Sequence, residues 1–261
     1  MLLKLEALGG LSPAGTLEEV RAGRRWSELF NGDLAARLCD PSYFKELAAL
    51  YPGTQLRRAP RLARLALRAA AGLAPGLVPP EKRALVLVTA YASVGSTFEF
   101  LDSLLDDGPP LASPTAFSHS VTNMSAAILS QNLDIQGLTL TLTQNDFHQG
   151  LEAAGALLQG GLADTVLLGA LGEIYGLMPE IEKLARPGGP PPLSDGAIFL
   201  SLSPGSPDQK GPPVEFNAPA YGDQGPLAQA WRLASLLAPN PARTVRCGPG
   251  RLEIQTREAG S

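Results

Sequence analysis

The sequence predicts an α/β fold with a mostly parallel central sheet, helices on both faces and a small C-terminal appendage. One observation is a strand–helix–strand pattern within residues 113–173. Another is that the fully apolar runs Ala84–Thr89 and Gly196–Leu202, typical of buried strands, alternate with helical patterns. Such alternation favours parallel strands that are connected through helices. Because Gly and Pro become frequent towards the C-terminus, we expect a main domain over residues 1–202 and an appendage over residues 203–261 packed on it.

The amino-acid composition excludes several classes of protein. The 261 residues are 44% hydrophobic, which is ample for one sizeable core. The net charge is −4 and the basic residues are scattered apart from Arg57–Arg68, so no nucleic-acid surface is expected. Cys39 and Cys247 have no metal-ligand spacing, which favours a reduced, cytoplasmic compartment. No signal peptide is expected, and no apolar run approaches the roughly 20 residues that span a bilayer.

The N-terminal region predicts a strand followed by a short helix. Leu2–Leu8 has a strand pattern that Gly9–Gly10 is expected to end. Thr16 is placed to cap a helix at Leu17–Ala22, with acidic residues in its first turn, where they favour the helix dipole.

Three helical segments are expected before the first buried strand. Leu34–Cys39 and Tyr43–Tyr51 have the patterns of short helices. Arg61–Ala74 is clearly amphipathic, with Leu and Ala on its inner face. Its expected outward side chains are Arg61, Arg64 and Arg68. After the strand at Ala84–Thr89, either Ser96 or Thr97 is expected to cap a helix at Phe98–Asp106.

The centre of the chain is Leu138–Gln144, where Thr alternates with Leu as in a strand. Asn145 and Asp146 are the candidate N-caps of the helix that follows, so the helix is expected to emerge at Gln144. Gly160–Gly161 is expected to close it. The apolar stripe of this helix is Phe147, Leu151, Ala154, Leu157 and Leu158, and the next strand begins at Thr165.

The C-terminal region predicts few regular elements. After a Pro/Gly linker at Pro187–Pro192 and the strand at Gly196–Leu202, one helix is expected at Leu227–Leu237. Arg243–Cys247 and Leu252–Thr256 have the pattern of a hairpin.

Few residues have the chemistry of a catalytic site. Gln144 stands where a Cys or Ser would be a nucleophile, but an amide only forms hydrogen bonds. It therefore either polarises or mimics a bound acyl carbonyl, or it merely caps the helix and fills space. His148 follows one turn later and has the chemistry of a general base, although a structural or surface role is favoured. The same holds for His119.

Other site chemistries are not supported. Asp106 and Asp107 are adjacent, and neighbouring residues do not face each other on a helix, so they do not form an acid–base pair. No G-x-G-x-x-G or Walker motif is present, and we expect no cofactor and no metal site. The aromatic residues Phe98, Phe100 and Phe117 are expected to pack in the core or in an interface.

Several segments, in order, resemble the N-terminal half of β-ketoacyl synthases of the thiolase superfamily. They are SPAGTLEEVRAG, RLARLALRAAAGLA, SPTAFSHSVTNMSAAILSQNLDIQG, GLADTVLLGALGE and DGAIFLSL. The resemblance covers roughly Leu2–Leu202 and implies a thiolase-like fold. Counting back from Gly161 places Gln144 at the position of the active-site Cys of the family. The two catalytic His residues of the family belong to its second half, and neither His119 nor His148 has their context.

The resemblance implies a non-condensing subunit without catalytic residues. Family members with Gln in place of Cys are typically chain-length factors, the partners of catalytic ketosynthases in type II polyketide synthases. The segment around Phe117 looks most like the short forms of aryl polyene pathways. The expected partner is a catalytic ketosynthase in a heterodimer, with an acyl carrier protein as an indirect partner.

The resemblance also implies an interface. In the family, the strand equivalent to Leu138–Thr143 pairs across a dimer axis, and residues near Phe117 and Val121 border the acyl tunnel of the partner. The expected tunnel and interface residues are Phe117, Val121, Asn123, Leu138, Leu140, Leu142, Gln144 and His148. Two alternatives stay open: a priming subunit that decarboxylates malonyl-carrier protein, and a stand-alone module that binds acyl carrier protein.

Overall fold

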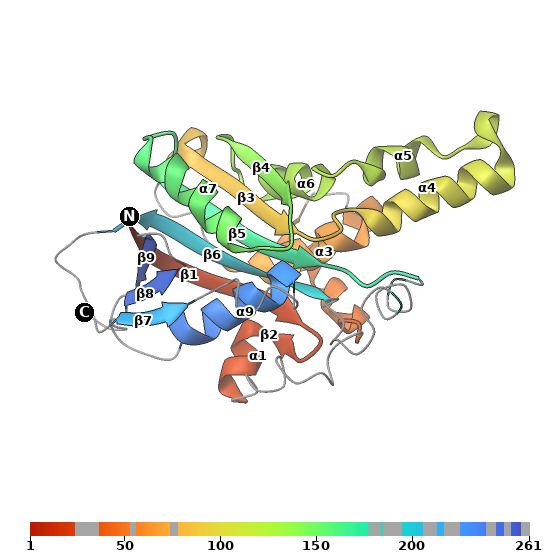
Figure 1. Cartoon of the computed structure of the whole chain (residues 1–261). Helices are drawn as coiled ribbons and strands as arrows, with labels where there is room; N and C mark the ends of the chain where they lie inside the picture. The colour runs from red at the N-terminus through yellow and green to blue at the C-terminus, as the bar shows by residue number, and fades with distance from the viewer. Residues whose placement is uncertain are drawn as a thin grey trace.

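The computed structural model describes residues 1–23, 37–52, 56–73, 78–176, 178, 184, 195–205, 213–216, 225–238, 244–247 and 252–256. In this part of the chain, one mixed sheet has the strand order β4-β3-β5-β6-β1-β9-β8-β7, with β2 paired to β1 (Figure 1). The strands are β1 (Leu2–Ser12), β2 (Gly15–Thr16), β3 (Arg83–Thr89), β4 (Thr139–Thr143), β5 (Thr165–Gly172), β6 (Gly196–Pro204), β7 (Pro213–Phe216), β8 (Thr244–Cys247) and β9 (Leu252–Gln255).

Helices cover both faces of the sheet, as predicted for an α/β fold. They are α1 (Leu17–Ala22), α2 (Leu47–Leu50), α3 (Arg61–Ala70), α4 (Val94–Asp107), α5 (Pro114–Ser120), α6 (Met124–Asn132), α7 (His148–Gln159) and α9 (Gly225–Leu237). Helices α3 and α6 pack in one apolar core, whereas α7 and α9 pack in the other. Strands β4, β3 and β5 are parallel, and β6 runs antiparallel to both β5 and β1.

Strand β1 is longer than predicted. It continues through Gly9 and Gly10 to Ser12, so the prediction that these glycines end the strand is wrong. A side chain at Gly9 would collide with the backbone oxygen of Ala69, and one at Gly10 would collide with the ring of Trp231. The two glycines therefore allow α3 and α9 to approach the sheet closely from opposite faces, which is a packing role.

The short helix α1 begins and ends where the sequence predicts. Its cap is reciprocal, because Thr16 Oγ1 accepts from the Glu19 backbone N–H and Glu19 accepts from the Thr16 backbone N–H at 2.7 Å. The expected helix at Tyr43–Tyr51 is instead a 3₁₀ helix, Pro41–Phe44, followed by α2. Of Leu34–Cys39, residues 34–36 lie outside the described part, and residues 37–39 are not helical.

Helix α3 has a buried ion pair at its start, which corrects the expectation that Arg61 points outward. Both terminal nitrogens of the Arg61 guanidinium donate to the Asp195 carboxylate at 2.6 Å, and the Asp195 side chain is fully buried. Asp195 also accepts from the backbone N–H groups of Cys39 and Ile174. The pair thus ties α3 to the start of β6 and to residues that follow β5.

Helix α4 begins earlier than predicted. Ser93 takes the N-cap position without a side-chain hydrogen bond, and Ser96 and Thr97 lie in the first turn, so neither is the cap. Thr97 Oγ1 instead donates to the Ser93 carbonyl, as hydroxyls inside helices often do. Figure 1 shows α4 and α5 projecting together beyond the sheet, joined by a 3₁₀ helix, Pro109–Leu111. We call residues 94–121 the arm.

The C-terminal segment extends the same sheet. Strands β8 and β9 form the predicted antiparallel hairpin, and β9 pairs in parallel with β1. Helix α9 covers the predicted Leu227–Leu237 and begins two residues earlier, at Gly225. The linker at Pro187–Pro192 lies outside the described residues. The division of the chain at residue 202 stays a prediction.

Candidate functional site

Gln144 lies at the end of the edge strand β4. Its backbone N–H donates to the Thr89 carbonyl at 3.0 Å, which continues the β3–β4 pairing by one residue, and the residue is exposed. Helix α7 begins only at His148, with Phe147 at the N-cap position. The prediction that the helix emerges at Gln144 is therefore wrong by about one turn, because Asn145–Phe147 form a turn between the strand and the helix.

Side chains of the protein itself close the N-terminus of α7. Asp146 Oδ1 accepts from the His148 backbone N–H at 2.9 Å, so one of the two candidate caps does supply a cap bond. Gln229, a fully buried residue of α9, accepts from the Phe147 N–H at 2.8 Å and donates to the Asn145 carbonyl at 3.1 Å. Helix N-termini with free N–H groups bind anions. Here the backbone N–H groups of Phe147 and His148 already have hydrogen-bond partners within the chain.

His148 is buried in the first turn of α7. Its Nε2 lies 3.3 Å from Glu152 Oε1, one turn further along the helix. Its Nδ1 is buried without a hydrogen-bond partner in the described part of the chain. Since Gln144 precedes the helix, the two residues do not share a helical face.

The expected tunnel residues of the arm are exposed apolar groups. The Phe117 side chain is 57% exposed, and its ring lies 5.3 Å from the ring of Phe100 on α4. Val121, which ends α5, is 41% exposed. Asn123 precedes α6 and makes no capping hydrogen bond with its side chain.

Strand β4 presents an apolar edge. It pairs only with β3 in the described structure, and its other edge is open. Leu138 and Leu140 are 45% and 38% exposed, whereas Leu142 packs partly against the core on the α7 side. An open, uncharged edge strand is a ready surface for pairing with another chain. Strand β4 and the arm together form what we call the docking face.

The base of the arm is anchored to the core. The backbone N–H of Gly95 donates to Glu173, a buried carboxyl group just after β5. Burial raises the pKa of Glu173 to about 7, and the nearby Arg61 guanidinium opposes this rise. Phe98 stacks on Tyr175 with ring centroids 6.3 Å apart. The start of α4 is therefore fixed, and the exposed apolar residues lie further along the arm.

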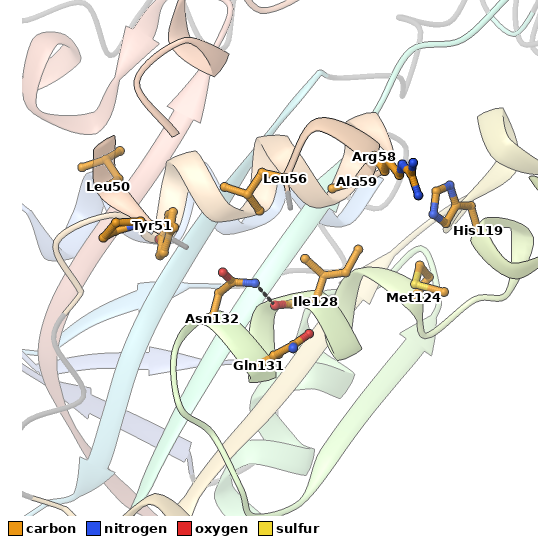
Figure 2. A pocket seen from close by; sticks show the side chains of 11 residues that line it. Leu50, Tyr51, Leu56, Arg58, Ala59, His119, Met124, Ile128, Gln131 and Asn132 are labelled. Carbon is orange, nitrogen blue, oxygen red and sulfur yellow. Dashed lines mark hydrogen bonds between the residues drawn. The ribbon is translucent and has the colours of Figure 1, made fainter. Parts of the chain in front are cut away.

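A separate open groove of about 780 Å³ lies beside α6. Figure 2 shows Arg58 and His119 facing each other at one end, with Ile128 and Asn132 along the wall. Gln144 does not line this groove, so the groove does not bring His119 and Gln144 together.

The described residues contain no group of His, Cys, Asp or Glu side chains arranged to hold a metal ion. None of the helices described is long and apolar enough to cross a membrane.

A Gln144→Cys variant should have an ordinary, accessible thiol. Residue 144 is exposed and lies before the helix, so neither burial nor the helix dipole perturbs it, and we expect a pKa of about 8.5. The check is the pH dependence of alkylation by iodoacetamide. The wild-type chain is a clean control, because Cys39 and Cys247 are buried and burial raises the pKa of the Cys39 thiol far above its usual range. A thiol that titrates below pH 7 would contradict this expectation.

Sequence reasoning missed Gln229, Asp195 and Glu173. Gln229 and Asp195 act on residues 82 and 134 positions away, and no local pattern signals such contacts. Glu173 belongs to the segment GLADTVLLGALGE, but the sequence does not indicate that its carboxyl group is buried.

Comparisons with known proteins agree with this architecture. Residues 34–175, more than half of the chain, match the family model for the N-terminal domain of β-ketoacyl synthases. No curated protein sequence is similar enough to match.

Solved structures have the same fold at low sequence identity. The ishigamide ketosynthase/chain length factor aligns with a TM-score of 0.62 and 21% identity over 77% of this chain and 62% of that chain. The ketosynthase ApeO in complex with its chain length factor ApeC, from Xenorhabdus doucetiae, aligns with a TM-score of 0.64 and 20% identity over 95% and 96%. AntDE:AntF, a type II polyketide synthase acyl-carrier protein in complex with its ketosynthase, aligns with a TM-score of 0.54 and 16% identity over 77% and 57%.

The chain thus spans less than two thirds of the first and third of these proteins and nearly the whole length of the matched ApeO–ApeC chain. At these identities the likeness establishes the fold. Together with the match over residues 34–175, it shows that this chain belongs to the β-ketoacyl synthase family, through its N-terminal domain.

Proposed function

We propose that this chain is a non-condensing, chain-length-factor-like subunit that pairs with a catalytic ketosynthase and helps to enclose its acyl tunnel. The observation that carries the proposal is Gln144, an amide at the residue where the family resemblance places the nucleophile. An amide cannot form an acyl-enzyme. The Phe147 N–H, which could otherwise bind developing negative charge, is already bonded to Gln229.

The docking face supports the pairing part of the proposal. In the described chain, β4 has an open edge and the arm projects beyond the sheet (Figure 1). Apolar side chains of the arm are exposed. Apolar surface of this kind is costly in water and is typical of an interaction site. Among the similar structures, two are described as a ketosynthase with a chain length factor. A catalytic ketosynthase is therefore the partner that we propose, in type II polyketide or aryl polyene biosynthesis.

Co-expression with a ketosynthase encoded beside it tests the function. We expect size-exclusion chromatography with light scattering to show a one-to-one heterodimer, and condensation only when both chains are present. A folded chain that does not bind the ketosynthase would refute the proposal and favour a module that binds acyl carrier protein. Decarboxylation of malonyl-carrier protein by the lone chain would instead favour a priming subunit.

A Phe117→Ala variant should lengthen the products of the pair. We propose that the exposed Phe117 ring projects into the partner's tunnel, where truncation to a methyl group makes room for a longer chain. The measurement is product length by mass spectrometry, with Leu105→Ala on the same arm as the matched control for pairing alone. An unchanged product profile with an intact heterodimer would remove Phe117 from the tunnel.

A further inference from the structure

The distribution of basic residues along this chain is strongly uneven. Residues 84–182 contain eleven Asp and Glu residues and no Lys or Arg. All 21 Lys and Arg residues therefore lie before or after this stretch. The stretch includes the whole arm and strand β4, so the docking face as defined here has no cationic Lys or Arg side chain of its own.

The arm combines apolar and acidic side chains. Leu105 and Leu111 are 80% and 71% exposed, and Leu101 and Phe117 are also exposed. Four carboxylates lie among them on α4 and are exposed as well: Glu99, Asp102, Asp106 and Asp107. Within the described part of the chain, no ion pair is formed by any of these four.

Several carboxylates outside this surface are paired with arginines. Asp195 binds Arg61, Glu46 lies 2.5 Å from Arg68, and Glu253 lies 2.9 Å from Arg246. Exposed carboxylates without an ion pair among the described residues also occur elsewhere, as at Glu18, Glu81 and Asp164, so the arm is distinguished by having no Lys or Arg in its own stretch of chain. A carboxylate that loses water in an interface costs free energy unless the partner supplies a cation or hydrogen-bond donors.

Two-fold pairing of identical chains is disfavoured by this arrangement. In such a dimer the same residues meet from both sides, so an acidic, apolar face meets its own copy. No Lys or Arg of this face is available to pair with the carboxylates of the other copy. An unlike subunit with Lys or Arg around the matching apolar patch would instead pair with them. Opposite charges at the rim of an interface also increase the rate of association.

We infer that the docking face selects an unlike, basic-rimmed subunit and that its carboxylates oppose pairing with a second copy of this chain. This inference rests on the proposed function, because it specifies the charge of the ketosynthase surface that the arm contacts. Discrimination arises here from repulsion in the wrong pair as well as from attraction in the right one.

Self-association of the isolated chain tests the repulsive part without a partner. We expect sedimentation velocity to show a monomer in 50 mM NaCl and increasing self-association in 500 mM NaCl, because salt screens the like charges. The D102N/D106N/D107N variant should self-associate in low salt at least about tenfold more tightly than wild type. The matched control E18Q/E81Q/D164N removes three exposed carboxylates away from the arm and should behave as wild type. A wild-type dimer that is indifferent to salt and to the arm substitutions would overturn the inference.

Association with the co-expressed ketosynthase tests the attractive part. The association rate constant should fall about tenfold between 50 and 300 mM NaCl, and the arm variant should associate more slowly with a weaker dependence on salt. A heterodimer whose association rate is unaffected by salt and by these substitutions would refute the inference and leave the proposed function intact. Absence of any heterodimer would refute the proposed function, and the self-association result would still decide the charge effect on self-pairing.

Discussion

A Leu140→Asp variant is expected to lose the proposed ketosynthase partner while remaining folded. Leu140 is the second residue of β4 and is 38% exposed in the isolated chain. We propose that pairing along the open edge buries this position, so a carboxylate there loses its hydration. Burial of an uncompensated charge is strongly unfavourable, and we expect the dissociation constant to increase at least about 100-fold. Isothermal titration calorimetry with the purified ketosynthase measures this change.

Leu162→Asp is the matched control for this experiment. Leu162 is 55% exposed in the turn after α7, outside the docking face, so the same substitution there should leave the affinity unchanged. Thermal melting of both isolated variants by circular dichroism tests whether each is folded. Equal affinities of wild type and a folded Leu140→Asp variant would exclude β4 from the interface.

An Arg61→Ala variant is expected to be severely destabilised. Among the described residues, removing Arg61 leaves the buried Asp195 carboxylate with only the backbone N–H groups of Cys39 and Ile174 as donors. Breaking a buried ion pair by removing one partner typically costs about 3–5 kcal/mol. For a chain of this size that corresponds to a decrease in Tm of roughly 10 °C. Calorimetry or denaturant unfolding measures it.

Arg64→Ala on the same helix separates this effect from general loss of an arginine. The Arg64 guanidinium lies 4.9 Å from the centre of the Phe44 ring and has no carboxylate partner among the described residues. Its loss should cost only about 1 kcal/mol. If Arg61→Ala were no more harmful than Arg64→Ala, the ion pair would not be a major support of the fold.

Local patterns in the sequence predicted most of the regular elements. The Thr16 cap, the alternating Leu138–Gln144 segment and the glycines after α7 depend on chemistry within one or two turns of chain, so their structures follow from neighbouring residues. The order of the family motifs likewise placed the chain among the ketosynthases, and the assignment of Gln144 to the position of the nucleophile stays a prediction. The sequence also shows that residues 84–182 contain no Lys or Arg. Only the structure shows that this stretch includes the projecting arm (Figure 1).

Tertiary structure decided the rest, because the deciding contacts join distant residues. The local sequence predicts that Gly9 and Gly10 end the strand. They instead lie inside β1, where α3 and Trp231 pack closely against them. Arg61 read as a solvent-facing residue, since helical periodicity says nothing of a carboxylate 134 positions away. The closure of the α7 N-terminus by Gln229 depends in the same way on how α9 docks. The sequence by itself therefore determined most of the regular elements and the family, and only the packing of the layers decided which polar groups are buried, paired or left exposed on the arm.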